Sequence, residues 1–144
     1  MKISQIAIFM ENKPGHLRSI CRTLADAGVS LTALSLADTS QYGILRLLAN
    51  DWEKARDVLA GAGFVVNVTE VLAVEVDDKP GGLLALLDIL GEANVNIEYM
   101  YAFTCKLGER AVMVLRFDDS DKAVAALQAH NVKVLAGPEI FRNV

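Results

Sequence analysis

Apolar residues follow two different periods along the chain, and the changes of period delimit the predicted elements. An apolar run with polar ends predicts a strand, whereas apolar residues spaced three and four apart predict a helix. In the first half these patterns predict a strand over Lys2–Met10, a helix from Pro14 to Gly28, strands over Ser30–Ala37 and Tyr42–Ala49, a helix over Ala55–Gly63, and a strand over Phe64–Val68.

The same order returns in the second half. The predicted elements there are a strand over Val71–Val76, a helix over Pro80–Ala93, strands over Val95–Cys105 and Arg110–Phe117, a helix over Ser120–His130, and a strand over Val132–Leu135. A βαββαβ order with right-handed crossovers gives a four-stranded antiparallel sheet with both helices on one face. The predicted fold class is therefore α+β, a duplicated ferredoxin-like sandwich. The other sheet face is left bare, so we expect repeat-to-repeat packing or a homodimer to cover it.

Residue identities confirm that the two halves are repeats. Residues 11–17 read ENKPGHL and residues 77–83 read DDKPGGL, a spacing of 66 that becomes 68 after an insertion near residues 106–108. A self-match of this length indicates two small complete folds rather than a solenoid. We therefore predict two domains, residues 1–70 and residues 71–144, with the last strand of one running almost directly into the first strand of the next.

Composition and charge indicate which kinds of binding partner the protein can have. The 144 residues are 53% hydrophobic and carry a net charge of −4, without the clusters of Lys and Arg that neutralise phosphates. We therefore expect no direct nucleic-acid partner. No apolar run approaches the roughly 20 residues that span a membrane, and no signal peptide is indicated. Cys21 and Cys105 lie too far apart for a metal motif. A cytoplasmic protein with reduced thiols and no membrane partner is the expectation.

The repeated loop carries the chemical argument. At residues 12–15 and 78–81 a strand ends and a helix begins within four residues, so the free N–H groups of the first helical turn point outward with partial positive charge. Such a turn accommodates a carboxylate, and an oxygen of Asn12 or Asp78 beside it could accept a hydrogen bond from an ammonium group. Together they describe a receptor for a free α-amino acid. The alternative is that Asn12 and Asp78 are ordinary N-caps, worth about 1 kcal/mol each, with nothing bound.

The motif [ND]-x-P-G between a strand and a helix, followed by V-[NS]-[LI], resembles the ACT domain, a small-molecule-binding regulatory module of amino-acid metabolism. The resemblance covers both repeats, essentially residues 2–137. It implies that two domains pair side by side in one antiparallel sheet. It also implies that an amino acid binds between the strand-one-to-helix-one loop of one domain and the start of strand two of the other.

Carried over by position, the resemblance assigns fourteen ligand-binding residues, which are Asn12, Lys13, Pro14, Gly15, His16, Leu17, Ser30, Asp78, Lys79, Pro80, Gly81, Gly82, Leu83 and Asn96. One implied site joins Asn12 and His16 with Asn96, and it is closer to the pattern of the family. The other joins Asp78 and Gly82 with Ser30. These differences between the repeats leave open whether both sites bind, or bind the same ligand.

Other candidate residues have two interpretations each. His16, in the first turn of a helix, is either a neutral hydrogen-bonding group at the site or an exposed helix residue. Tyr99, Tyr101 and Phe103 alternate on one strand face, where they wall a pocket or belong to the core or a dimer interface. Cys21 falls on the apolar stripe of its helix and is predicted to be core. Cys105 is predicted to be unreactive.

Three further predictions concern surface and packing residues. His130 is expected at the surface. The acidic group Asp118, Asp119 and Asp121 is expected to be a solvated helix cap rather than a metal site. Trp52 is expected to anchor the second helix to the sheet.

No catalytic motif is present in the sequence. An enzyme of the acylphosphatase kind would need an Arg in the loop, where both repeats have Lys, so we expect no catalysis. The sequence therefore predicts a non-catalytic regulatory protein that binds an amino acid or related metabolite, forms a homodimer, and uses no cofactor and no metal. A regulatory subunit of a metabolic enzyme and a transcription-linked regulator remain alternatives, and an enzyme partner is a further expectation.

Overall fold

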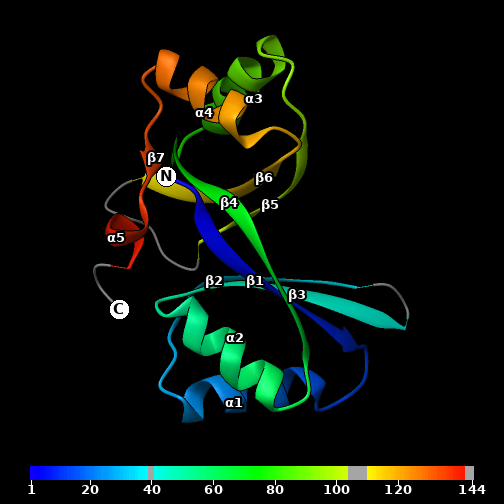
Figure 1. The fold of residues 1–144 in the computed structure, drawn as a ribbon. Coiled ribbons are helices and arrows are strands. Elements are labelled where there is room, and N and C mark those ends of the chain that lie inside the picture. The colour runs from blue at the N-terminus through cyan, green and yellow to red at the C-terminus, as the bar shows by residue number, and fades with distance from the viewer. Residues whose placement is uncertain (39–40, 104–109, 142–144) are drawn as a thin grey trace. The chain divides into compact units, whose positions relative to one another are not determined.

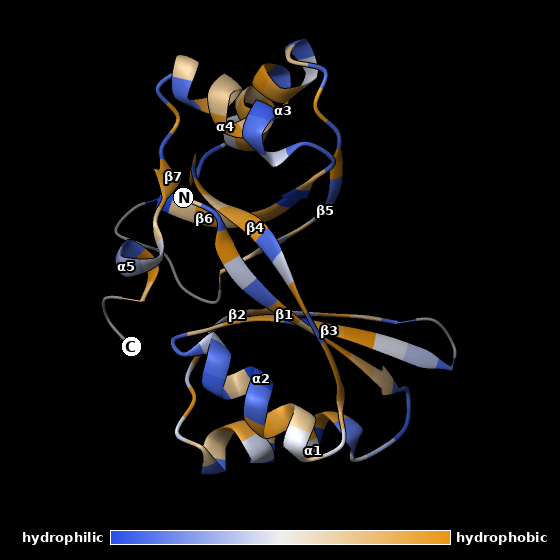
Figure 2. Ribbon diagram, viewed as in Figure 1, coloured by the Kyte–Doolittle hydropathy of each residue, from blue (hydrophilic) through white to orange (hydrophobic). Residues whose placement is uncertain are grey.

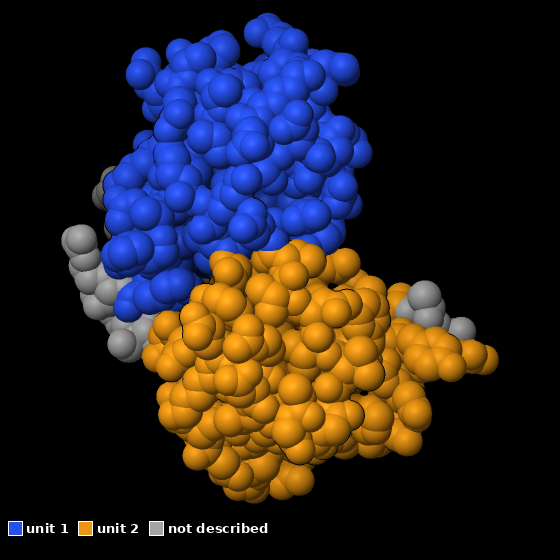
Figure 3. Space-filling model, in the orientation of Figure 1, with its two compact units in different colours: residues 1–3, 70–142 blue, residues 4–69, 143–144 orange. Residues whose placement is uncertain are grey.

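The computed structural model describes residues 1–38, 41–103 and 110–141. These residues divide into two compact units, coloured separately in Figure 3. We call residues Ser4–Thr69 the N-terminal unit, and Met1–Ile3 together with residues 70–141 the C-terminal unit. The change of unit falls within one strand, between Thr69 and Glu70.

The N-terminal unit is a βαββαβ fold. Its elements are β1 (Ile3–Glu11), α1 (His16–Asp26), β2 (Leu31–Asp38), β3 (Tyr42–Ala49), α2 (Trp52–Gly61) and the beginning of β4 (Val65–Asp77). The strands lie in the order β2-β3-β1-β4, with β3 antiparallel to both β1 and β2. Figure 1 shows α1 and α2 together on one face of these strands.

The core of this unit lies between the sheet and the two helices. Alternate residues of β1 and β3 point inward, with Ile8 opposite Leu45 and Ile6 opposite Leu47. They meet the buried stripe of α1, Ile20 and Leu24. In Figure 2 both α1 and α2 alternate between hydrophilic and hydrophobic residues, as expected for helices with one face in water.

The C-terminal unit repeats the arrangement. It consists of the rest of β4, α3 (Gly82–Glu92), β5 (Ile97–Ala102), β6 (Arg110–Phe117), α4 (Ser120–Ala129), β7 (Val134–Leu135) and a short α5 (Gly137–Ile140). β4 pairs with β6 and β7, and β6 pairs with β5, all antiparallel. A second core forms beneath α3 and α4, with Phe117 among its largest fully buried side chains. The predicted duplicated ferredoxin-like fold is therefore confirmed.

Three element boundaries differ from the sequence predictions. The strands predicted over residues 64–68 and 71–76 are one strand, β4, because no turn residue interrupts Val65–Asp77. The helices predicted to begin at Pro14 and Pro80 begin two residues later, because Gly15 and Gly81 adopt the left-handed conformation and act as N-caps. The helix α5 was not predicted. Its Glu139 Oε2 accepts a hydrogen bond from the Ala136 backbone N–H at 2.8 Å.

Cys21 was predicted to be core and this was wrong, since its side chain is exposed. The buried stripe of α1 runs through Ile20 and Leu24, and Cys21 lies on its flank. Cys105 lies outside the described residues. Trp52 packs against the N-terminal core as expected, and the Arg56 guanidinium lies 5.2 Å from its ring centroid.

The acidic group at the start of α4 is a helix cap, as predicted. Asp119 accepts a hydrogen bond from the Lys122 N–H at 3.0 Å, and Asp118 accepts from its neighbour Asp119 at 2.9 Å. His130 is exposed, with Nδ1 3.0 Å from the Ala126 carbonyl. Among the described residues, no helix is long and apolar enough to cross a membrane.

Candidate ligand-binding site

The loop before α1 is shaped by its glycine. Gly15 has φ +89°, which an L side chain rarely adopts, and no side chain caps the helix. The Ser19 N–H donates to the Gly15 carbonyl at 2.9 Å. The alternative interpretation of Asn12 and Asp78 as N-caps is therefore wrong, because Gly15 and Gly81 hold those positions.

Asn12 instead fastens the loop to the end of β2. Its Nδ2 donates to Asp38 Oδ2 at 3.1 Å, and its backbone N–H donates to the Gln41 carbonyl at 2.9 Å. The next residue, Lys13, places Nζ 2.9 Å from Glu11 Oε2. This ion pair lowers the pKa of Glu11 below its usual value, and His16 adds a smaller effect in the same direction.

The loop before α3 has the same backbone course but a different position after the glycine. Gly81 has φ +84° and Gly82 donates its N–H to the Lys79 carbonyl at 3.0 Å. A Cβ atom at Gly82 would overlap the Asp77 carbonyl oxygen. The counterpart of Gly82 in the first repeat is His16, so the first loop accommodates a side chain where the second cannot.

The two predicted strand-two residues lie away from their own loops. Ser30 is held by Asn50, whose Oδ1 accepts the Ser30 N–H at 3.1 Å, and Asn96 is held in the same way by Asp118 at 3.0 Å. Ser30 precedes β2, whose far end adjoins the loop of the same unit through Asp38, and Asn96 precedes β5. The structure therefore does not bring the loop and the strand-two residue of one unit together. The predicted combination of each loop with the strand-two residue of the other repeat stays a prediction.

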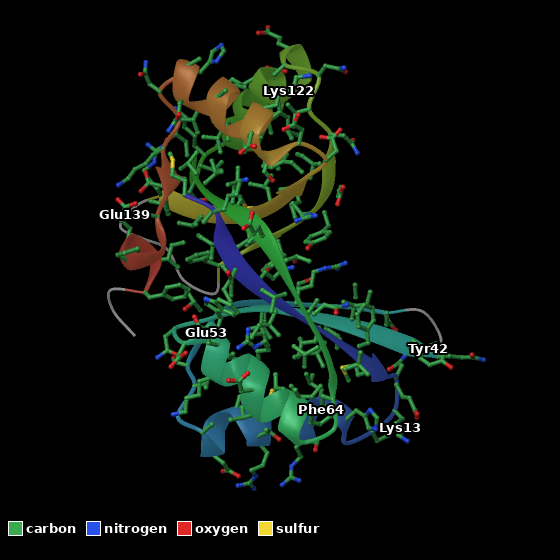
Figure 4. All side chains as sticks on the ribbon, viewed as in Figure 1. Lys13, Tyr42, Glu53, Phe64, Lys122 and Glu139 are labelled. Carbon is green, nitrogen blue, oxygen red and sulfur yellow. The ribbon has the colours of Figure 1, made fainter. Side chains whose placement is uncertain are left out.

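A cavity of about 690 Å³ lies at the loop end of the N-terminal unit. Its wall includes strand residues from β1, β2 and β3, the residues that lead from α2 into β4, and His16 at the start of α1. Figure 4 labels Tyr42 and Phe64 of this wall at the same end of the unit as Lys13. The lining residues are Phe9, Met10, Glu11, His16, Ala37, Asp38, Tyr42, Gly43, Ile44, Arg46, Ala62, Gly63, Phe64 and Val65.

This cavity has the character of a small-molecule site. Its volume falls within the range of about 300–1,000 Å³ that such sites occupy, and most of its wall is apolar. The charged groups in the wall are Glu11, Asp38 and Arg46. His16 Nδ1 is buried and has no hydrogen-bond partner among the described residues. A buried polar atom left unsatisfied costs free energy, which a bound ligand group can recover.

A smaller cavity of about 110 Å³ lies in the C-terminal unit. It is bounded by Glu75, Asp77, Gly82 and Arg110, together with apolar residues of α3. Two ion pairs join residues of its lining, from Arg110 to Glu75 at 3.1 Å and to Asp77 at 2.8 Å. The charged side chains that line this cavity thus pair with one another.

Of the fourteen predicted ligand-binding residues, His16 lines the large cavity and Gly82 lines the small one. Sequence reasoning missed the strand residues of the large cavity, such as Phe9, Ile44 and Arg46. One signal singles out Phe9, which is an apolar residue at a position whose counterpart in the second repeat, Glu75, is charged. Tyr99, Tyr101 and Phe103 line neither described cavity, and Tyr101 is buried.

The part of the chain that the structure describes contains no cluster of three or more side chains suited to hold a metal ion. The site is therefore described by its apolar wall, its opposite charges and the unsatisfied His16 nitrogen.

Solved structures similar to this chain share its fold. Protein BT0572 from Bacteroides thetaiotaomicron is 34% identical, with 99% of this chain and 97% of that chain covered and a TM-score of 0.92. The regulatory subunit of aspartate kinase from Thermus thermophilus, in its ligand-free form, is 16% identical, with 89% and 90% covered and a TM-score of 0.64. Aspartate kinase from Synechocystis is 19% identical, with 93% of this chain but 26% of the kinase covered and a TM-score of 0.60.

A search of curated proteins gave no match. The sequence matches the ACT domain pair family over residues 1–142, which includes both repeats and both loops. The chain therefore belongs to the ACT domain pair family, whose fold is that of amino-acid-binding regulatory domains.

Proposed function

We propose that this protein is a non-catalytic regulator that binds a free amino acid or a closely related metabolite. The observation that carries the proposal is the cavity of about 690 Å³ at the Pro-Gly loop of the N-terminal unit. The cavity combines an apolar wall with carboxylates at Glu11 and Asp38 and a guanidinium at Arg46. These groups complement the ammonium, the carboxylate and the carbon skeleton of an amino acid.

The loop residues support the same assignment. The first turn of α1 presents backbone N–H groups and the positive end of the helix dipole next to His16. Asn12 and Asp38 hold each other, so the loop is fixed before a ligand arrives. A preformed site loses less ordering entropy on binding than a mobile one. The predicted residues Asn12–Leu17 therefore keep their place in the proposal, as the frame of the cavity.

Binding acts through a partner in this proposal. A ligand shifts a conformational equilibrium only as far as it binds one state better than the other, and the preferred state then contacts a partner differently. An enzyme of amino-acid metabolism is the partner class we favour. The similar Thermus thermophilus protein, named as a regulatory subunit, has 90% of its length covered by this chain, so a separate ACT pair of this size serves an enzyme there.

Thermal unfolding with each common amino acid at millimolar concentration tests the function. A ligand present at about 100 times its dissociation constant adds about 2.7 kcal/mol to the stability. For a chain of this size we expect the melting temperature to rise by several degrees with one or a few amino acids. The matching hydroxy acids, which lack the ammonium, serve as controls. No shift with any amino acid would contradict the proposed function.

We also propose that the protein is a homodimer that uses the edge strand β2. Leu34 and Leu36 of this strand are 39% and 49% exposed, and β2 is the last strand of its sheet. Edge strands with exposed apolar residues pair readily with another chain. Sedimentation velocity should give a dimer, and Leu36→Lys should give a monomer with an unchanged circular dichroism spectrum. A wild-type chain that sediments as a monomer at micromolar concentration would exclude this assembly.

A further inference from the structure

The two cavities occupy equivalent positions in the two repeats. In the N-terminal unit Phe9 pairs with Ile44 and Glu11 pairs with Tyr42. At the same register of the C-terminal unit Glu75 pairs with Val112 and Asp77 pairs with Arg110. The sequence spacing of the repeats gives the same correspondence. The equivalent lining residues are Phe9 and Glu75, Glu11 and Asp77, His16 and Gly82, and Tyr42 and Arg110, and the sequence spacing also aligns Val65 with Lys133.

Ion pairs join the charged residues at the cavity of the C-terminal unit. Arg110 contacts Glu75 at 3.1 Å and Asp77 at 2.8 Å, and Lys133 lies 3.9 Å from Glu75. Glu75 is the best buried of these groups, with its side chain 16% exposed. Because Arg110 is paired with two carboxylates at once, a ligand would have to break both pairs before it could use this guanidinium. The small volume of about 110 Å³ agrees with a closed site.

The N-terminal unit has uncharged residues at three of the same positions. Phe9, Tyr42 and Val65 are 44%, 63% and 61% exposed, so apolar surface faces water where the other repeat has ion pairs. Exposed apolar side chains gathered in a hollow indicate a binding surface rather than random scatter. A ligand that covered these side chains would remove their apolar surface from water, and this burial would favour binding.

The residue that follows Gly15 or Gly81 also differs between the repeats, and this difference again favours ligand binding in the N-terminal unit. His16 contributes a buried Nδ1 without a hydrogen-bond partner among the described residues. Gly82 contributes no side chain, and the Asp77 carbonyl leaves no room for one. One repeat therefore offers a polar atom to a ligand, whereas the backbone of the other has closed over the same place.

We infer that the chain binds one ligand, in the N-terminal cavity, that this ligand is an α-amino acid with an apolar side chain, and that the ion pairs of Arg110 hold the second site shut. The inference rests on the proposed function and narrows it. In the bound state the ligand side chain lies against Phe9 and Val65. Its ammonium shares the Glu11 carboxylate with Lys13, its carboxylate faces Arg46, and His16 Nδ1 gains a partner.

The charges in the wall explain the choice of amino acid. Glu11 and Asp38 are two carboxylates against one guanidinium, Arg46. An acidic side chain would add a negative charge beside these carboxylates and be repelled. A basic side chain would lose its hydration against Phe9 and Ile44, at a cost that an apolar side chain avoids. In a zwitterionic amino acid with an aliphatic or aromatic side chain, the ammonium and carboxylate can pair with the charged groups of the cavity while the side chain packs against its apolar wall.

Isothermal titration calorimetry on the full chain tests the inference. Leucine, isoleucine, valine, methionine and phenylalanine are titrated separately, with aspartate, glutamate and lysine as the charged comparison. We expect one site per chain for at least one apolar amino acid and weaker binding of the charged ones. Two sites per chain, or preference for a charged amino acid, would overturn the inference from the wild-type protein alone.

Exchange of the equivalent residues gives the matched variants. The first variant, Phe9→Glu with Tyr42→Arg and Val65→Lys, puts the closing ion pairs into the N-terminal cavity at exposed positions. We expect it to bind about 100-fold more weakly, as for a pocket that loses its apolar complement. The reverse variant, Glu75→Phe with Arg110→Tyr and Lys133→Val, should keep the wild-type affinity. Unfolding curves establish that both variants fold.

The outcomes separate the two proposals. If no amino acid gives heat with the wild-type chain, the proposed function fails. If the wild-type chain binds and the first variant binds equally well, the function stands and the assignment to the N-terminal cavity is overturned. Loss of binding in the reverse variant would place the ligand in the C-terminal cavity and overturn it as well. His16→Gly, which copies the other repeat, should weaken binding about 10-fold.

Discussion

Replacing Gly82 by alanine is expected to destabilise the protein by about 3 kcal/mol, because the new Cβ would overlap the Asp77 carbonyl oxygen. The neighbour is backbone, which cannot rotate away as a flexible side chain can. Relief requires β4 and α3 to move apart at the loop that joins them. For a chain of 144 residues this corresponds to a loss of roughly 10 °C in melting temperature.

Gly91→Ala is the matched control on the same helix. Gly91 lies within α3, and a Cβ atom there would meet nothing within 4 Å. Alanine is the better helix former, so this variant should gain about 0.5–1 kcal/mol. Thermal and urea unfolding of the two variants should therefore change in opposite directions. Equal melting temperatures would mean that the close approach of Asp77 does not exist in solution.

The fold was predictable because the spacing of apolar residues distinguishes helices from strands in each repeat, and glycines mark where helices end. Tyr42–Ala49 and Arg110–Phe117 were predicted as strands with the bounds they have, since both are apolar runs between polar ends. The helix starts were misplaced by two residues. The sequence motif contains both proline and glycine, and only the left-handed backbone of Gly15 decides which one precedes the helix.

The candidate site was predicted only in part. The loop motif identified His16, which lines the cavity, because the duplication placed the loop between a strand and a helix. It could not identify Phe9 or Arg46, which come from strands and reach the cavity only through the β1–β3 register. Strand register describes which residues of two distant segments lie opposite each other, and it cannot be read from the spacing of apolar residues within one segment. The pairing of His16 with Asn96 stays a prediction.

The duplication itself carries information that a single domain would not. Both repeats keep the glycine turn, Gly15 and Gly81, because the backbone there needs a positive φ. They differ at positions where the backbone conformation does not require a particular residue type, such as Phe9 and its counterpart Glu75. Differences of this kind show where the repeats have separate chemical roles. In the inference drawn above, the N-terminal cavity is the sensor and the C-terminal cavity binds no ligand.

Phe117→Ala is expected to cost about 3–5 kcal/mol, since the ring is 2% exposed in the centre of the C-terminal core. The N-terminal core contains none of the side chains that pack around this ring. We therefore expect faster amide hydrogen exchange in α3, α4 and β6, with little change in α1 and α2. Native-state exchange followed by mass spectrometry measures both regions in one experiment.

Leu47→Ala is the mirror variant, in the core of the N-terminal unit, where Leu47 is fully buried. It should cost about 2–5 kcal/mol and raise exchange in α1 and α2 instead. It should also weaken ligand binding, because the cavity wall is attached to this core, whereas Phe117→Ala should leave binding unchanged. Equal exchange increases in both regions would show that β4 couples the two cores into one cooperative structure. In that case residues 1–70 and 71–144 would not be independent domains, and a ligand in one cavity would stabilise the whole chain.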